Sequence, residues 1–138
     1  MRKVFIFGTF DGLHEGHHSL LRQARAHGDH LTIAVAQDHI VEQLKNHPPK
    51  KPMHERIDAL LEVDGVDIVI PGDEELGTYH VVRRHKPDVI ALGYDQRELK
   101  FDLEEHARDF DWEVEIVVLE PFEPEKYHSS ILENNSGK

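Results

Sequence analysis

Two kinds of hydrophobic pattern alternate along this chain. Continuous apolar runs, typical of strands buried in a parallel sheet, predict five strands at residues 2–7, 31–36, 66–70, 89–92 and 112–119. Segments with apolar residues at helical spacing predict helices at residues 17–27, 38–44, 53–63, 74–85 and 103–110. Strands that alternate with helices predict an α/β fold, a Rossmann-like parallel five-stranded sheet with helices on both faces.

One segment is incompatible with both patterns. Residues 46–52 include three prolines, which break helices and strands alike, so this stretch is predicted to be a loop. A length of 138 residues suffices for one compact core, and we expect a single domain over residues 1–133. A short helix is expected near Ser129, and residues 134–138 are expected to form a flexible tail.

The predicted topology indicates where a ligand binds. Parallel α/β sheets bind ligands beyond the carboxyl ends of their strands, at the point where the strand order reverses. We expect the first and fourth strands to flank that point. Their carboxyl ends lead into residues 8–11 and 93–96, so these two loops are the first candidates for a site.

Charge and composition narrow the classes of partner. The formal net charge is −11, so the protein repels nucleic acid and anionic membranes, and neither is expected as a partner. No apolar run approaches the roughly 20 residues of a membrane-spanning helix, and the first apolar run is too short for a signal peptide. The absence of cysteine excludes disulfides and thiolate chemistry, and a cytoplasmic location is expected.

The loop after the first predicted strand carries the strongest chemical signal. Residues 8–17 read Gly-Thr-Phe-Asp-Gly-Leu-His-Glu-Gly-His and lead into a helix. Glycines let backbone approach a phosphate closely, and a helix start offers free N–H donors. His14 and His17, on either side of Gly16, can donate hydrogen bonds to one phosphate group. Attack on an α-phosphorus builds charge on its equatorial oxygens, which such donors stabilise.

Two simpler interpretations of the same residues remain open at this point. The glycines can mark an ordinary turn, with the histidines at the surface. Alternatively, His14, His17 and His18 can ligate zinc, but no third ligand stands at a standard spacing, so we expect no protein-held metal.

The complete string in its strand–loop–helix setting resembles the signature of the cytidylyltransferase-like nucleotidyltransferase superfamily. This resemblance implies the HIGH-type nucleotidyltransferase fold, and it is strongest to the archaeal-type FAD synthetases. It implies that His14 and His17 contact the triphosphate and stabilise the transition state. It also assigns nucleotide binding to Gly8, Thr9, Phe10 and Gly16.

Two further segments match this family. The loop Gly93-Tyr94-Asp95-Gln96 is similar to the nucleotide-binding loop of the FAD synthetases, which assigns Gly93, Asp95 and Gln96 to the nucleotide. In isolation it is also compatible with a polar turn. Ser129 and Ser130, which follow His128, can cap a helix, and the resemblance assigns both to the triphosphate. Cytidylyltransferases commonly have an arginine a few residues earlier, where this chain has only Lys126.

Four charged residues complete the predicted site. The resemblance implies phosphate-binding, catalytic roles for Lys45 and Arg56, although Lys50 and Lys51 compete with Lys45 for its role. A surface position on the helix is the alternative for Arg56. Asp11 and Asp38 are candidates for the acceptor pocket, or they are simple caps.

These observations predict a nucleotidyltransferase that transfers AMP from ATP to FMN, giving FAD and pyrophosphate. A divalent cation such as Mg²⁺ is expected to accompany the triphosphate, held by substrate and water. One alternative is a cytidylyltransferase that uses CTP and glycerol 3-phosphate or a similar small phosphorylated alcohol. A second is a non-catalytic nucleotide- or metal-binding module, and a third is an adenylyltransferase that acts on a sugar phosphate. The resemblance also implies a homodimer.

Overall fold

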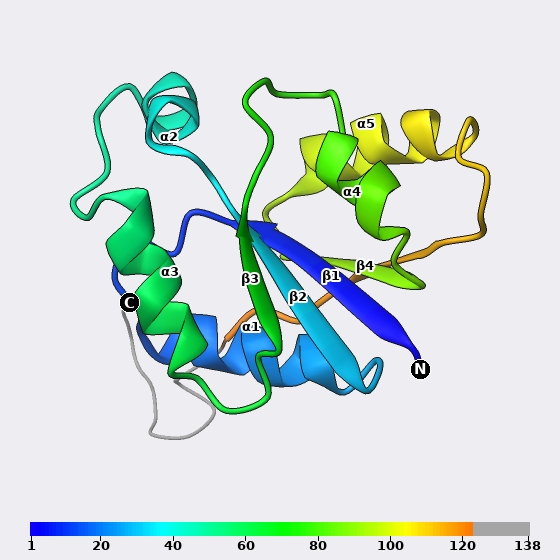
Figure 1. Cartoon of the computed structure of the whole chain (residues 1–138), viewed down its shortest axis with the longest axis horizontal. Coiled ribbons are helices and arrows are strands. Elements are labelled where there is room, and N and C mark those ends of the chain that lie inside the picture. Colours follow the sequence, from blue (N-terminus) through cyan, green and yellow to red (C-terminus); the bar gives the residue numbers. More distant parts are fainter. Residues whose placement is uncertain (123–138) are drawn as a thin grey trace.

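A computed structural model describes residues 1–122 of the chain (Figure 1). Ser129, Ser130, the helix expected near Ser129 and the predicted tail lie outside these described residues. In chain order the elements are β1 (Lys3–Gly8), α1 (Glu15–Arg25), β2 (His30–Val35), α2 (Asp38–Lys45), α3 (Met53–Leu61), β3 (Ile68–Pro71), α4 (His80–His85), β4 (Val89–Leu92), α5 (Arg97–Ala107) and β5 (Glu115–Val118).

The five strands form one parallel sheet in the order β3-β2-β1-β4-β5. The central strand β1 pairs on one side with β2, where Val4 lies opposite Leu31, and on the other with β4, where Val4 lies opposite Val89. The predicted α/β class and five-stranded parallel sheet are confirmed. Strand order reverses between β1 and β4, so the two candidate loops do flank the switch point.

Side chains of β1 alternate between two cores. Val4 and Ile6 pack with Leu21 of α1 and Leu60 of α3 on one face of the sheet. Phe5 points the other way, into a cluster made by α4 and α5 that includes Val82 and Leu103. Figure 1 shows these helix pairs on opposite sides of the sheet. Burial on both faces explains why the strands are continuously apolar.

Two helices differ most from their predicted extents, each for a local reason. The helix expected at 74–85 begins only at His80, because Gly77 and Tyr79 have φ of 81° and 55°, a left-handed backbone that interrupts a helix. The helix expected at 103–110 instead spans Arg97–Ala107. Its first turns are mostly polar, and only Leu99 and Leu103, spaced by four, mark their common buried face.

In the part of the chain that the structure describes, no helix combines the length and apolar character needed to cross a bilayer.

Candidate active site

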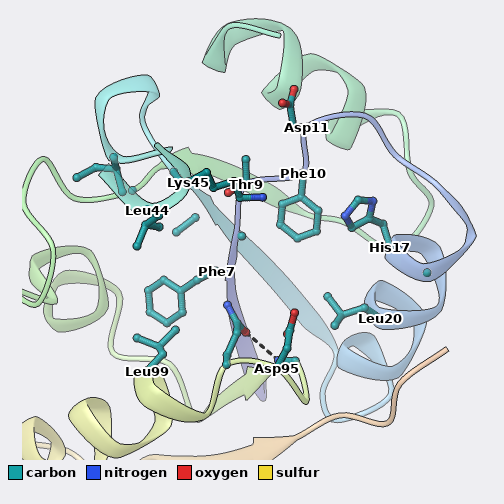
Figure 2. Close-up of a pocket in the computed structure, with 18 of the residues that line it drawn as sticks. Phe7, Thr9, Phe10, Asp11, His17, Leu20, Leu44, Lys45, Asp95 and Leu99 are labelled. Atoms are coloured by element: carbon teal, nitrogen blue, oxygen red, sulfur yellow. Dashed lines mark hydrogen bonds between the residues drawn. The ribbon is translucent and has the colours of Figure 1, made fainter. Parts of the chain in front are cut away.

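A cavity of about 1040 Å³ opens beyond the carboxyl ends of β1, β2 and β4. Its walls come from the loop after β1, the start of α1, α2, residues 72–79 between β3 and α4, the loop after β4, and residues 120–122. Figure 2 shows Phe10, His17 and Leu20 on one side of this cavity and Phe7, Leu44 and Leu99 on the other. The side beside α1 also carries His14, Glu15 and the backbone of residues 8–12, and we call it the polar half of the cavity. The side beside α2 and α5 is the apolar half.

The polar half is built on a tight turn after β1. Phe10 adopts a left-handed φ of 53° although it is not glycine, which costs on the order of 1 kcal/mol. Its buried ring folds back under Gly8, where an added Cβ would lie 2.4 Å from Phe10 Cε2. Glycine is thus required at position 8 for the turn to close, and the backbone of this loop lies directly at the cavity.

The two predicted histidines cap α1 and each other. His14 Nδ1 accepts a hydrogen bond from the Gly16 N–H at 3.0 Å, and His17 Nδ1 accepts one from the His14 N–H at 3.3 Å. The rings stack with centroids 3.8 Å apart. An Nδ1 that accepts leaves the proton of a neutral imidazole on Nε2. Both rings are therefore fixed as Nε2–H donors at the helix start.

The surroundings of His17 lower its pKa below the ordinary value. Burial is the largest cause, electrostatic interactions with His14, His18 and Lys45 lower the pKa further, and a backbone hydrogen bond at Gly12 acts to raise it. A bound polyanion acts in the opposite direction, because negative charge favours the protonated ring. A bound triphosphate should therefore raise the pKa of His17 back toward its ordinary value.

Arg56 has a different place from the one predicted. Its side chain is fully buried and does not line the cavity. The guanidinium donates to the Thr9 carbonyl at 2.9 Å, the Lys51 carbonyl at 2.9 Å and Asp38 Oδ1 at 2.7 Å. Arg56 thus braces the loop after β1 from behind, and Asp38 faces Arg56. The phosphate-binding role of Arg56 and the acceptor-binding role of Asp38 stay predictions that these contacts do not favour.

Asp11 joins the same brace from the cavity side. Its two oxygens accept the backbone N–H groups of Lys50 at 2.6 Å and Lys51 at 2.9 Å, which fixes the proline-rich loop to the phosphate loop. Burial acts to raise the pKa of Asp11, but these hydrogen bonds and the charge of Arg56 outweigh it and lower the pKa. Asp11 lines the cavity as predicted, with both oxygens already engaged.

Of the three lysines considered for a phosphate role, Lys45 alone lines the cavity. It is the last residue of α2, and Figure 2 shows it beside Thr9. The side chains of Lys50 and Lys51 are not on the cavity wall. The geometry therefore favours Lys45 over its two competitors.

The loop after β4 brings Gly93, Asp95 and Gln96 to the polar half. Gln96 Oε1 accepts the Gly93 N–H at 2.8 Å, which fixes the side-chain amide and leaves its NH₂ group as the donating end. An added Cβ at Gly93 would lie 3.1 Å from Asp95 Oδ1 and 3.5 Å from Leu20 Cδ1. Small size at position 93 thus keeps this part of the cavity open.

Sequence reasoning missed the apolar half. Its wall is formed by residues from several separate elements: Phe7, Ile40, Leu44, Leu76, Tyr79 and Leu99. Tyr79 is buried, its ring meets Phe7 edge-on at 6.4 Å, and its hydroxyl donates to Asp102 at 2.8 Å. Burial and the Asp102 carboxylate raise the pKa of Tyr79 well above its usual range. The one signal in the sequence was the unbroken apolar run of β1, which contains Phe7.

The fold and this site together define a nucleotidyltransferase. Residues 5–134 match the cytidylyltransferase-like family, and the chain belongs to it. The chain is 38% identical over 120 residues to the FAD synthase of Pyrococcus abyssi, which covers 85% of this chain and 79% of the relative. It is 33% identical over 133 residues to the FAD synthase of Thermococcus sibiricus, covering 96% and 87%.

Solved structures show the same architecture. The lipopolysaccharide core biosynthesis protein from Thermoplasma volcanium superposes with a TM-score of 0.82 at 31% identity, covering 89% of this chain and 99% of that chain. A pantoate–β-alanine ligase from Francisella tularensis has a TM-score of 0.60 at 15% identity, which shows a common fold alone.

Proposed function

We propose that this protein transfers AMP from ATP to FMN, giving FAD and pyrophosphate. Relatives that resemble it over most of their length are FAD synthases. The observation that carries the choice of acceptor is the apolar half of the cavity, which fits a flat aromatic ring system. A small phosphorylated alcohol would leave that wall exposed, so a cytidylyltransferase acting on glycerol 3-phosphate is not favoured.

The reaction needs positioning more than it needs a base. A phosphate oxygen of FMN attacks the α-phosphorus of ATP, the new P–O bond forms, and the bond between the α-phosphorus and the bridging oxygen breaks. Pyrophosphate leaves with that electron pair. The phosphate of FMN is already ionised at neutral pH, so His14 and His17 serve as Nε2–H donors to the charged oxygens, together with the start of α1. Lys45 supplies a positive charge beside them.

The two substrates occupy the two halves of the cavity. ATP lies in the polar half, with its phosphates on residues 8–17 and its nucleoside toward Gly93, Asp95 and Gln96. FMN lies with its phosphate toward Lys45 and its ring against the apolar wall. Burial of apolar surface contributes about 25 cal/mol per Å², so a flat ring covering this wall gains several kcal/mol. Contacts from Ser129 and Ser130 to the triphosphate stay a prediction.

Magnesium fits this site as a companion of the nucleotide. Among residues 1–122 no group of three histidine, aspartate or glutamate side chains is arranged to hold a metal ion. Mg²⁺ readily keeps several waters and binds through substrate phosphates. We therefore assign its ligands to the triphosphate and water, where it would neutralise phosphate charge. A homodimeric state and a cytoplasmic location likewise stay predictions.

A matrix assay tests the proposal. ATP and CTP are each combined with FMN, glycerol 3-phosphate and phosphosugars, with Mg²⁺ present, and pyrophosphate release is measured. We expect release only with ATP and FMN together, with FAD formed in equal amount. Turnover with CTP and glycerol 3-phosphate would replace the proposal with its alternative. Binding of ATP without turnover on any acceptor would favour a non-catalytic module.

A further inference from the structure

A glutamine side chain of α1 holds the segment that follows β5. Leu119 still pairs with the sheet, through its N–H to the Leu92 carbonyl at 2.8 Å. The next residue, Glu120, bonds instead to the side chain of Gln23 on α1. Gln23 Oε1 accepts the Glu120 N–H at 2.8 Å, and Gln23 Nε2 donates to the Glu120 carbonyl at 3.0 Å. The two residues are 97 positions apart in the sequence.

This reciprocal pair has the form of a backbone ladder. An amide side chain offers one donor group and one acceptor, and here both meet the N–H and C=O of a single residue. Gln23 Nε2 also donates to Ser19 Oγ at 3.2 Å, one turn earlier on α1, which fixes the orientation of the amide. Gln23 thus takes the place of a neighbouring strand where the sheet has ended.

The segment held in this way forms part of the cavity. Glu120, Pro121 and Phe122 all line it. Phe122 Cβ lies 3.9 Å from the point where a Cβ on Gly16 would stand, at the start of α1 where the phosphates are assigned. In Figure 1 the orange chain after β5 runs to α1. The wall of the polar half therefore depends on a contact that lies outside the cavity itself.

We propose that Gln23 is a positioning residue for the nucleotide: it holds residues 120–122 as the wall that closes the ATP half of the cavity over α1. This inference rests on the proposed function for the assignment of that half to ATP. The proposal predicts a change in the affinity for ATP alone. A contact that only stabilised the packing of β5 on α1 would change the free energy of unfolding but not the affinity for one substrate.

The test compares Gln23→Met with Gln43→Met. Methionine keeps the length of the side chain and a helical residue but removes both hydrogen bonds to Glu120. Gln43 is an exposed glutamine of α2 that does not line the cavity, which makes it a matched control. Binding of Mg·ATP is measured by calorimetry without any acceptor, KM is measured for ATP and FMN, and amide exchange is followed at Glu120.

For Gln23→Met we expect faster exchange at Glu120, an ATP dissociation constant raised about tenfold, and a KM for FMN within about twofold of wild type. Gln43→Met should match wild type throughout. Unchanged exchange at Glu120, or wild-type affinity for ATP despite faster exchange, would overturn the inference alone. Wild-type protein that binds no ATP would overturn the proposed function, and the inference with it.

Discussion

The two halves of the cavity are built in opposite ways. The polar half is centred on one contiguous stretch, residues 8–17, whose histidines cap the start of α1 and whose backbone is braced from behind by Arg56. The loop after β4 and residues 120–122 complete it. The apolar half is assembled from β1, α2, the loop before α4 and α5, and its rim residues Leu44 and Leu76 are 57% and 54% exposed. Transfer of a phosphate-linked group requires donors fixed in place, whereas a flat ring requires only a surface of suitable shape.

The sharpest way to break this comparison is to remove a fixed donor. His17→Ala should lower kcat by about 10²–10³, the usual cost of losing one donor to transition-state charge, while the fold survives. His54→Ala is the control, because that side chain is 77% exposed and lies outside the cavity. Turnover of both variants is measured with saturating ATP and FMN. A kcat for His17→Ala equal to that of the control would take His17 out of catalysis.

The next largest effect should come from the brace. Arg56→Met leaves the carbonyls of Thr9 and Lys51 without their buried donor, and we expect a loss of about 2–4 kcal/mol in the free energy of unfolding. Asp38 is half-exposed and can turn to water, which limits the cost. Urea denaturation measures the change, with Arg22→Met on the exposed face of α1 as control. A loss of ATP affinity with no loss of stability would restore the phosphate-binding role predicted from the sequence.

A smaller and more selective effect is expected in the apolar half. Leu44→Ser removes apolar surface from the rim and should raise KM for FMN roughly tenfold, with KM for ATP unchanged. Leu61→Ser offers a matched control, because Leu61 is 51% exposed on α3 and does not line the cavity. Steady-state kinetics with each substrate varied in turn make the comparison. Equal effects on both substrates would contradict the division of the cavity.

The smallest effect concerns protonation. His14→Asn keeps a capping side chain but removes the electrostatic interaction of the His14 ring with His17, so the pKa of His17 should rise toward its ordinary value, while burial still lowers it. A pKa lower in the folded than in the unfolded state means that the unfolded chain binds more protons between the two values. The free energy of unfolding therefore rises with pH between these two pKa values and falls on acidification. Above about pH 6.5 His17 is neutral in both states, and no further change follows from it. NMR titration of the His17 ring checks the shift.

The fold was largely predictable because its strands are buried on both faces and therefore appear as unbroken apolar runs. Helix starts were less predictable. Nothing in the sequence marks Tyr79 as the left-handed residue that delays α4, and His14 is an unusual helix cap, so α1 begins two residues before its predicted start. The start of α1 depends on the local cap that His14 makes with Gly16 and His17, whereas Tyr79 before α4 is held by a tertiary partner, Asp102, which no local pattern reveals.

The site shows the same division between features set by local sequence and features set by tertiary contacts. Residues 8–17 and 93–96 were found because their chemistry is contiguous. The direction in which Arg56 points could not be predicted, because it depends on the Thr9 and Lys51 carbonyls that folding brings to it. The apolar wall was missed because a leucine in a half-buried helix has the same pattern whether it faces a core or a ligand.

The close packing of Gly8 and Phe10 has a consequence for engineering. An alanine at position 8 collides with the aromatic ring, and a smaller side chain at position 10 empties the space beneath the turn. Either change alone should damage the loop, whereas a compensating pair can in principle rebuild it. Libraries that vary the two positions together will therefore sample working enzymes that one-at-a-time mutagenesis never reaches.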